Sequence, residues 1–307
     1  MIPIKVLLAT QKPFAEAAVD AMNNVLNVKE IELIQLQGYK TKRELLSEVK
    51  AVDALIVRSD TIDKEVFCKA KQLKLVIRAG SGYDNIDIKA AHDAGVVVMN
   101  TPGQNANAVA ELVFGLLLFG VRNGFSGVSG VELKGKTLGI HAFGNVGQNV
   151  ARIAHGFDMK VLAYDPYTPS VKIFKWGVTP VSCAEELYSK SDIISLHLPY
   201  TALTKGLVNS QLLKNLPLKA VLVNTARNEV ICEEDMLQML QERTDFKYLT
   251  DITPSQLSKF QSYKNQFLTT SQKTGAQTYE ANINAAVAAA HELVDFFTSG
   301  NVQFQVN

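Results

Sequence analysis

The stretch that decides the fold is TLGIHAFGNVGQNVARIA, residues 137–154. A short apolar run, 137–140, leads into the loop Ala142-Phe143-Gly144-Asn145-Val146-Gly147, and a helical pattern continues to residue 154. The next apolar run, 160–164, ends in Asp165. This order predicts a βαβ unit, which is the context in which a glycine-rich loop becomes a dinucleotide-binding fingerprint.

Each position of the loop has a physical task in such a fingerprint. Gly144 lets the backbone approach a pyrophosphate at the helix N-terminus, where free N–H groups and the helix dipole favour negative charge. Asn145 and Val146, in the first helical turn, belong to the same predicted site, and Gly147 lets helix and strand pack closely. Asp165 would accept hydrogen bonds from the adenosine ribose and repel a 2′-phosphate, which favours NAD over NADP. The alternative is a strand–helix turn without a ligand.

Ala142 departs from the fingerprint, because a glycine normally opens the loop. A β-carbon at this position is harmless if φ is negative and costs about 1–2 kcal/mol if φ is positive.

Eight further apolar runs recur along the chain with helical patterns between them. With the two runs above, the predicted strands are 4–9, 31–36, 54–57, 73–77, 96–99, 137–140, 160–164, 192–196, 220–223 and 248–251. Most are continuously apolar, as expected of parallel strands that helices cover on both faces. A length of 307 residues suits two domains of about 150 residues. We therefore predict two doubly wound α/β domains of Rossmann or flavodoxin type.

Composition narrows the class of protein. The formal net charge is +1, from 31 Lys and Arg against 30 Asp and Glu, so no basic field marks a nucleic-acid binder. The cysteines, Cys68, Cys183 and Cys232, are few and widely spaced, which argues against disulfides or a metal site and suits a reducing compartment. The longest apolar stretch, 112–121, is about half of a membrane span. We expect a soluble cytoplasmic protein.

A long apolar helix is predicted from about residue 105 to 121, followed by a glycine-rich connection from 124 to 135. A helix that is apolar nearly all round is buried, either inside its own domain or against a second subunit. We favour a homodimer contact, with the core of a single domain as the alternative.

Five motifs occur in the order typical of one enzyme family. They are RAGSGYDNID (78–87), NAVAE (107–111), the loop at 142–147, SLHLP (195–199) and NTAR (224–227). The chain thereby resembles the D-2-hydroxyacid dehydrogenases over nearly its whole length. The segment VRS (57–59) and the ending FF…FQV (296–306) resemble the short D-3-phosphoglycerate dehydrogenases within that family.

The resemblance implies an NAD-binding domain, 103–278, inserted into a substrate domain formed by 1–102 and 279–307. Because the chain stops soon after its last helix, we expect no C-terminal domain for serine inhibition. By family position, a further set of residues lines the cofactor site: His197, Pro199, Thr225, Ala226 and Asp251. An ordinary histidine at the end of a strand is the alternative for His197.

Arg227 follows the strand at 220–223, at the edge where α/β sheets place ligands. Its guanidinium can hold a substrate carboxylate bidentately and polarise a carbonyl in the reverse reaction. The alternative is a surface arginine that pairs with Glu229 or Glu233.

The usual base of the family is a histidine two residues before a glycine, and here that position is Lys273, before Gly275. The supporting glutamate of the family is expected near residue 256, which is Gln256. A neutral lysine needs no carboxylate behind it, so the two departures are consistent with each other. Desolvation on domain closure and the nearby charge of Arg227 would lower the pKa of Lys273, our candidate acid/base. A solvated loop lysine is the alternative.

The backbone N–H groups of Gly80, Ser81 and Gly82 form a candidate anion nest for the substrate carboxylate. Family matching adds Arg78 to this substrate-binding set. For a phosphorylated substrate, Arg58 and Ser59 are candidate phosphate contacts, because a second anion needs a second cluster of donors. A surface charge at the end of a strand is the alternative for Arg58.

These residues suggest three functions. The first is NAD-dependent oxidation of D-3-phosphoglycerate to 3-phosphohydroxypyruvate, the entry to serine synthesis. The second is reduction of hydroxypyruvate, glyoxylate or another 2-keto acid without phosphate. The third is an inactive NAD(H)-sensing binding protein, which Ala142, Lys273 and Gln256 favour and the retained Arg227 and Asp165 oppose.

Overall fold

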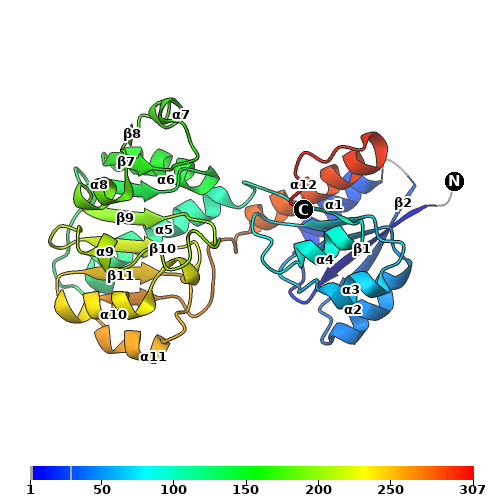
Figure 1. Cartoon of the computed structure of the whole chain (residues 1–307), viewed down its shortest axis with the longest axis horizontal. Helices are drawn as coiled ribbons and strands as arrows, with labels where there is room; N and C mark the ends of the chain where they lie inside the picture. Colours follow the sequence, from blue (N-terminus) through cyan, green and yellow to red (C-terminus); the bar gives the residue numbers. More distant parts are fainter. Residues whose placement is uncertain (1–2, 28–29) are drawn as a thin grey trace. The chain divides into compact units, whose positions relative to one another are not determined.

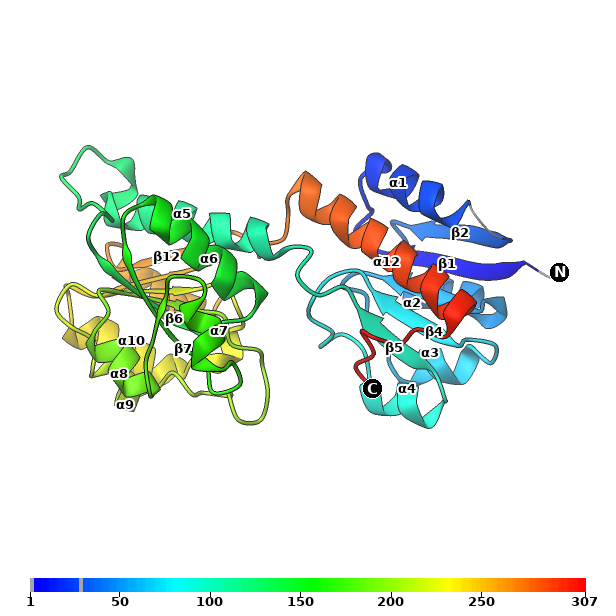
Figure 2. The same ribbon diagram turned by 90° about the horizontal axis from the view of Figure 1, so that it is seen from above.

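The computed structural model describes residues 3–27 and 30–307. The chain divides into two compact units (Figures 1 and 2): unit 1 is Met1–Asn105 with Gln277–Asn307, and unit 2 is Ala106–Ala276. Unit 2 is therefore an insertion in the sequence of unit 1. The expected domain boundaries, after residue 102 and before residue 279, lie close to these limits. Of the expected substrate domain, residues 1–2 and 28–29 lie outside the described residues.

Unit 1 contains a parallel five-stranded sheet with the order β2-β1-β3-β4-β5. Its strands are β1 (Ile4–Thr10), β2 (Ile31–Gln37), β3 (Ala54–Val57), β4 (Leu75–Arg78) and β5 (Val97–Asn100). Its helices are α1 (Glu16–Leu26), α2 (Lys42–Glu48), α3 (Lys64–Lys69), α4 (Ile88–Asp93) and α12 (Tyr279–Ser299), with a 3-10 turn at Val49–Ala51. This strand order is that of a flavodoxin-like doubly wound sheet. The order in which successive strands are added along the sheet reverses between β1 and β3, while all strands stay parallel.

Unit 2 contains a parallel seven-stranded sheet with the order β12-β11-β10-β9-β6-β7-β8. Its strands are β6 (Thr137–His141), β7 (Lys160–Tyr164), β8 (Thr179–Pro180), β9 (Ile193–Leu196), β10 (Val221–Asn224), β11 (Lys247–Thr250) and β12 (Phe267–Thr269). Its helices are α5 (Ala106–Val121), α6 (Asn145–Gly156), α7 (Ser170–Phe174), α8 (Ala184–Ser189), α9 (Ser210–Leu213), α10 (Glu233–Glu242) and α11 (Leu257–Phe260). Three 3-10 turns lie at Asn123–Phe125, Asn228–Val230 and Gln261–Tyr263. The strand order is that of a Rossmann sheet, and it reverses between β6 and β9.

The predicted fold class, two doubly wound parallel sheets, is confirmed. The two strands absent from the prediction, β8 and β12, form the edges of the unit 2 sheet and have only two and three residues. Such short edge strands carry too little apolar sequence to stand out from the loops around them.

Both faces of each sheet are covered, which explains the continuous apolar runs. In β1, Val6 and Leu8 pack against α1 and α12, whereas Leu7 and Ala9 belong to the core that α2, α3 and α4 cover. In unit 2, α5 and α6 cover one face and α8, α9 and α10 cover the other. Because successive side chains of a strand point to opposite faces, a strand covered twice must be apolar at every position.

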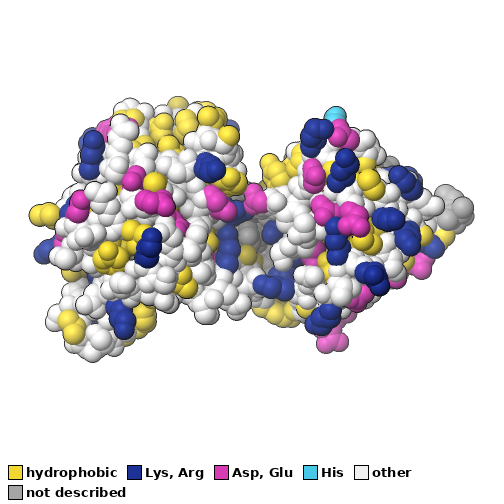
Figure 3. Space-filling view, turned by 60° about the horizontal axis from the view of Figure 1, so that its bottom comes forward, with side chains coloured by type: hydrophobic (Ala, Val, Ile, Leu, Met, Phe, Trp, Pro, Cys, Tyr) yellow, Lys and Arg dark blue, Asp and Glu magenta, His cyan; other side chains and the backbone are white. Residues whose placement is uncertain are grey.

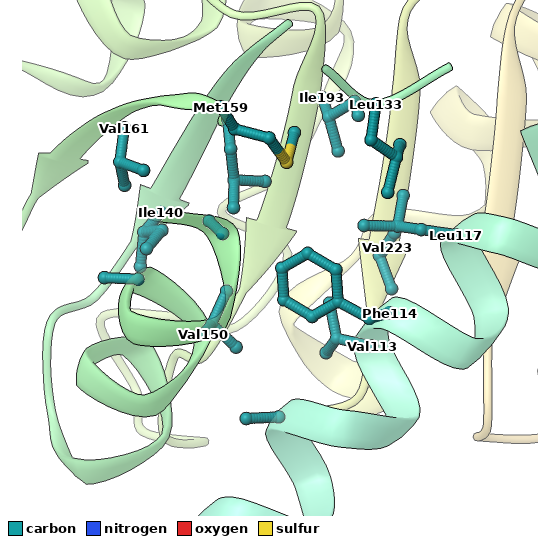
Figure 4. Close-up of a cluster of buried hydrophobic side chains, with 14 of the residues drawn as sticks. Val113, Phe114, Leu117, Leu133, Ile140, Val150, Met159, Val161, Ile193 and Val223 are labelled. Atoms are coloured by element: carbon teal, nitrogen blue, oxygen red, sulfur yellow. The ribbon is translucent and has the colours of Figure 1, made fainter. Parts of the chain in front are cut away.

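Helix α5 lies mostly inside the core of unit 2. Figure 4 shows Val113, Phe114 and Leu117 pointing from this helix toward strand residues such as Ile140 and Val223. The alternative of a core helix within one domain therefore holds for most of its surface. Phe119, near its end, remains 38% exposed.

Acidic and basic side chains are interspersed over the face in view in Figure 3, in keeping with the balanced charge of the sequence. Within residues 3–27 and 30–307, no helix is both long and apolar enough to cross a membrane.

One carboxyl group makes the stability of unit 1 depend on pH. Glu292 on α12 is only 8% exposed, and its Oε2 atom has no hydrogen-bond partner in the described part of the chain. Burial, together with the nearby charge of Asp295, raises the pKa of Glu292 from its ordinary 4.5 to about 8. The folded chain thus holds a proton that the unfolded chain releases above about pH 4.5.

We expect the free energy of unfolding to decrease between pH 5 and pH 8 by about 2–4 kcal/mol through Glu292. The stabilisation from Glu292 is fully present below the pKa of this group in the unfolded chain, about 4.5. It is lost as the pH rises through the pKa of Glu292 in the folded chain, about 8. Glu292→Gln should remove this slope in urea titrations at several pH values. Glu280→Gln, at an exposed position of the same helix, is the control. An unchanged slope in Glu292→Gln would contradict the prediction.

Candidate active site

The glycine loop of unit 2 joins β6 to α6 at the reversal point of the sheet. Gly144 is the N-cap residue of α6, so Asn145, Val146 and Gly147 form its first turn. A β-carbon built at Gly144 would have no atom within 4 Å, which leaves open space beside the free N–H groups of the helix. A β-carbon at Gly147 would lie 2.6 Å from the carbonyl oxygen of Ala142, so this position requires glycine for close packing.

Ala142 has a φ angle of +79°, in the region that favours glycine. The departure from the fingerprint therefore introduces backbone strain. The predicted cost of about 1–2 kcal/mol applies to this conformation.

We expect Ala142→Gly to raise the free energy of unfolding by about 0.5–1 kcal/mol. Relief of strain exceeds the extra entropy that a glycine adds to the unfolded chain. Urea denaturation would measure this difference. Ala202→Gly, in an exposed turn without positive φ, should lower stability slightly. A destabilised Ala142→Gly variant would show that the loop tolerates the β-carbon without strain.

The carboxylate of Asp165, just after β7, is already positioned by the loop around it. Its Oδ2 atom accepts hydrogen bonds from the Phe143 backbone N–H at 2.8 Å and the Thr168 hydroxyl at 3.1 Å. Its Oδ1 atom accepts one from the Tyr167 backbone N–H at 2.8 Å. A carboxylate offers about four lone-pair sites, so Oδ1 is the oxygen better able to accept a ribose hydroxyl.

Arg227 and Lys273 lie side by side although 46 residues separate them in the sequence. The Arg227 Nη1 atom donates to the carbonyl oxygen of Ala226 at 2.9 Å, and the Lys273 Nζ atom donates to the same oxygen at 3.0 Å. Asn224 fixes this loop, because its side chain donates to the Arg227 carbonyl and accepts from the Ala226 N–H. Two cationic groups therefore converge at the carboxyl end of β10.

Asp251, at the end of β11, holds the turn that follows Lys273. Its Oδ2 atom accepts from the backbone N–H groups of Thr274 at 3.1 Å and Gly275 at 2.8 Å. Burial raises the pKa of Asp251, against the opposing effect of these bonds. Its Oδ1 atom and the Thr225 hydroxyl are buried and have no hydrogen-bond partner among the described residues. Buried polar atoms of this kind are normally satisfied, so both are suited to a ligand.

His197 and Pro199 follow β9 at the same edge. The His197 Nε2 atom lies 2.9 Å from the Ser195 hydroxyl, and burial with the nearby His141 lowers the pKa of His197 to about 3. His141 is fully buried, lies 3.3 Å from the Tyr188 hydroxyl through Nδ1, and has a pKa that burial lowers to about 4. Both rings are thus neutral near pH 7, so neither adds charge to the site.

The Gln256 side chain is engaged by charged neighbours on its own side of the loop network. Its side-chain amide donates to Glu234 at 3.1 Å and accepts from Lys259 at 2.6 Å. Its backbone N–H donates to Glu233, whose buried carboxylate also accepts from the side chain of Asn228 and the N–H of Ser255. Glu233 therefore connects the loop that carries Arg227 to the loop that carries Gln256.

The substrate-binding residues predicted in unit 1 follow the neighbouring strands β3 and β4. The Arg78 Nε atom donates to the carbonyl oxygen of Arg58 at 3.0 Å. The guanidinium of Arg78 covers Gly80, where a β-carbon would lie 1.6 Å from Nη1, and φ is +142°. The Ser81 hydroxyl accepts from the Gly103 N–H at 3.3 Å, while the N–H groups of Gly80, Ser81 and Gly82 have no protein acceptor in the described part of the chain. These N–H groups are suited to an anion.

The Arg58 side chain is fixed by hydrogen bonds and a ring contact, unlike a solvated arginine at the surface. Its guanidinium donates to the carbonyl oxygens of Lys12 at 3.3 Å and Pro13 at 3.2 Å and to Asn282 Oδ1 at 2.5 Å, and it lies 4.9 Å above the Phe14 ring. These three bonds use three of the five guanidinium donors. Ser59 is exposed beside it.

Two supporting residues of this site, Asn224 and Glu233, were not predicted as site residues from the sequence. Asn224 lies in the NTAR motif, and an asparagine before a turn signals hydrogen bonding to nearby backbone. Glu233 acts across loops that only the folded sheet brings together, so no local pattern marks it.

The strand order and the glycine loop define unit 2 as a dinucleotide-binding domain of Rossmann type. A family profile described as "D-isomer specific 2-hydroxyacid dehydrogenase, NAD binding domain" matches residues 120–273, which lie within unit 2. The chain belongs to the D-isomer specific 2-hydroxyacid dehydrogenase family, a family of NAD-dependent oxidoreductases.

Individual relatives point to the same family. A 3-phosphoglycerate dehydrogenase from Entamoeba histolytica, whose crystal structure holds NAD+, is 44% identical, with a TM-score of 0.93 and 99% of each chain covered. A D-3-phosphoglycerate dehydrogenase from Methanocaldococcus jannaschii is 36% identical over 70% of this chain and 44% of its own. A hydroxypyruvate reductase from Thermotoga maritima is 37% identical over 71% of this chain and 74% of its own. The chain spans about half of the length of the curated phosphoglycerate dehydrogenases that it matches.

The residues of unit 2 fit NAD, the cofactor of the family. Gly144 leaves room for a pyrophosphate, Asp165 presents an acceptor for ribose, and Thr225 and Asp251 supply buried polar atoms without partners. When bound, NAD accepts a hydride at its nicotinamide ring.

Proposed function

We propose that this protein is an NAD-dependent dehydrogenase that oxidises D-3-phosphoglycerate to 3-phosphohydroxypyruvate, the entry to serine synthesis. The observation that carries the proposal is the convergence of Arg227 and Lys273 on the carbonyl oxygen of Ala226, beside the residues that fit NAD.

In the proposed reaction, Arg227 holds the substrate carboxylate and orients C2 for hydride transfer. Lys273, as a neutral amine, takes the proton of the 2-hydroxyl group at Nζ. A neutral amine still donates to Ala226 and keeps its lone pair for this proton. Gln256 is engaged with Glu234 and Lys259, so in this proposal Lys273 acts as the acid/base without a carboxylate behind it.

Unit 1 supplies the anion-binding groups in this proposal. The N–H groups of Gly80, Ser81 and Gly82 and the side chain of Arg78 are assigned to the substrate carboxyl end. Arg58 retains two guanidinium donors for a phosphate, and Ser59 adds an exposed hydroxyl. The likeness to the Entamoeba 3-phosphoglycerate dehydrogenase supports the phosphorylated substrate.

A spectrophotometric screen of NADH formation tests the substrate. We expect kcat/KM for D-3-phosphoglycerate to exceed that for D-glycerate by at least about tenfold. Higher activity on D-glycerate, or efficient NADH oxidation by hydroxypyruvate and glyoxylate alone, would favour the second candidate, a 2-keto acid reductase. The likeness to the Thermotoga hydroxypyruvate reductase makes that comparison necessary. Tight NADH binding without any turnover would instead identify an NAD(H)-sensing binding protein.

We also propose a cytoplasmic homodimer. Four apolar side chains at the end of α5 and in the connection after it, Phe119, Phe125, Val128 and Val131, are 38–66% exposed, and the rings of Phe119 and Phe125 pack edge to face at 5.3 Å. A second copy of this chain is the proposed occupant of this surface, because exposed apolar surface is characteristic of interfaces. Sedimentation should give a mass of twice 33.6 kDa. Val128→Asp should yield monomers, whereas Leu218→Asp, at a separate exposed leucine, should not.

A further inference from the structure

A buried carboxylate lies where the sheet of unit 1 reverses direction. Asp60 is 4% exposed and follows β3, next to β1, the pair of strands between which the order reverses. In doubly wound sheets, ligands bind outside the carboxyl ends of the strands at this reversal point. The loops after β1 and β3 therefore occupy the expected ligand-binding edge of unit 1.

Asp60 connects the loops after β1, β2 and β3. Its Oδ1 atom accepts from the backbone N–H of Gln11, after β1, at 2.7 Å and from the hydroxyl of Tyr39, after β2, at 2.9 Å. Its Oδ2 atom accepts from the backbone N–H of Arg58, after β3, at 3.3 Å. Burial and the neighbouring Asp60 raise the pKa of Tyr39, so its hydroxyl remains a donor.

These bonds hold Arg58 at both of its ends. Asp60 binds the Arg58 backbone directly, and through Gln11 it fixes the segment whose Lys12 and Pro13 carbonyl oxygens accept from the Arg58 guanidinium. The carbonyl oxygen of Asp60 accepts from Asn85 at 2.6 Å, which adds the loop after β4 to the same network. Loss of the carboxylate would loosen the Arg58 backbone and the segment that carries two of its guanidinium acceptors. The charge of Arg58 and its contacts with Asn282 and Phe14 would remain.

We propose that Asp60 is a positioning residue that orients the Arg58 guanidinium and thereby sets the preference for a phosphorylated substrate. The inference rests on the proposed function, in which Arg58 contacts the phosphate. Asp60 itself touches no substrate in this proposal.

The test compares KM and kcat for D-3-phosphoglycerate and D-glycerate in Asp60→Ala and Asp60→Asn. In Asp60→Ala, we expect KM for the phosphorylated substrate to rise about tenfold, with kcat within about twofold and KM for D-glycerate unchanged. Asp60→Asn keeps an acceptor for Gln11 and Tyr39, so its KM for the phosphorylated substrate should rise less. This variant also tests the proposal if Asp60→Ala fails to fold. In an Arg58→Ala background, Asp60→Ala should add little, because both changes remove the same contact.

The control is Asp53→Asn, at the opposite end of β3. Asp53 accepts from the Lys5 N–H at 3.1 Å and from the Lys74 ammonium at 3.1 Å, so its replacement disturbs the same sheet away from the carboxyl edge. We expect an unchanged phosphate preference there. A preference retained by both Asp60 variants, in a wild type that has one, would overturn the role of Asp60 and leave the proposed function intact. A wild type without any phosphate preference would overturn both.

Discussion

Replacing Arg227 by glutamine is expected to lower kcat/KM for 2-hydroxy acid oxidation about a thousandfold. The guanidinium would hold the substrate carboxylate through two charge-assisted hydrogen bonds, and removing one partner of such a pair costs about 2–5 kcal/mol. Initial rates of NADH formation measure the effect. The dissociation constant of NADH should change little, because the Arg227 side chain is not among the groups assigned to the cofactor, and Gly144 and Asp165 lie on other loops.

Two variants make this result specific. Arg227→Lys keeps the charge and loses the planar pair of donors, so it should recover only part of the activity. Arg243→Gln removes an arginine of the same unit that binds Asp245 at 2.6 Å, and it should affect stability rather than kcat/KM. If Arg227→Gln kept kcat/KM within about threefold of the wild type, Arg227 would not hold the substrate.

Replacing Lys273 by methionine is expected to lower kcat/KM by about 10²–10⁴-fold, the contribution typical of a general acid or base. Methionine preserves length and apolar contact but cannot carry a proton. The pH profile gives a second readout, since the rise of kcat/KM with pH that reflects deprotonation of Lys273 should disappear. Lys273→Arg should be equally impaired, because a guanidinium cannot be deprotonated at these pH values.

Lys264→Met is the matched control for this prediction, since Lys264 is an exposed loop lysine in the same unit. It should retain the activity and pH profile of the wild type. If Lys273→Met kept near-wild-type kcat/KM across the pH range, Lys273 would not be the acid/base. It would then be a solvated loop lysine.

The local patterns of the sequence were sufficient for the fold. Continuous apolar runs such as 4–9 and 160–164 indicate strands covered on both faces, and the glycine loop at 142–147 indicates the dinucleotide-binding turn of a βαβ unit. These signals are readable because a strand and its neighbouring turn are made of adjacent residues. The fold class, the family and NAD all followed from such adjacent residues, whereas β8 and β12 were too short to be recognised.

Only the tertiary structure decided how distant residues combine. The sequence left the φ angle of Ala142 open, and the β6–α6 turn sets it at +79°. Arg227 and Lys273 share the Ala226 carbonyl oxygen because β10 and β12 end at the same edge of one sheet, which places the loops after them close together. Asp60 joins three loops for the same reason in the other sheet. Parallel strands bring together the residues that follow each strand. The spacing of these residues along the chain does not predict which of them come into contact.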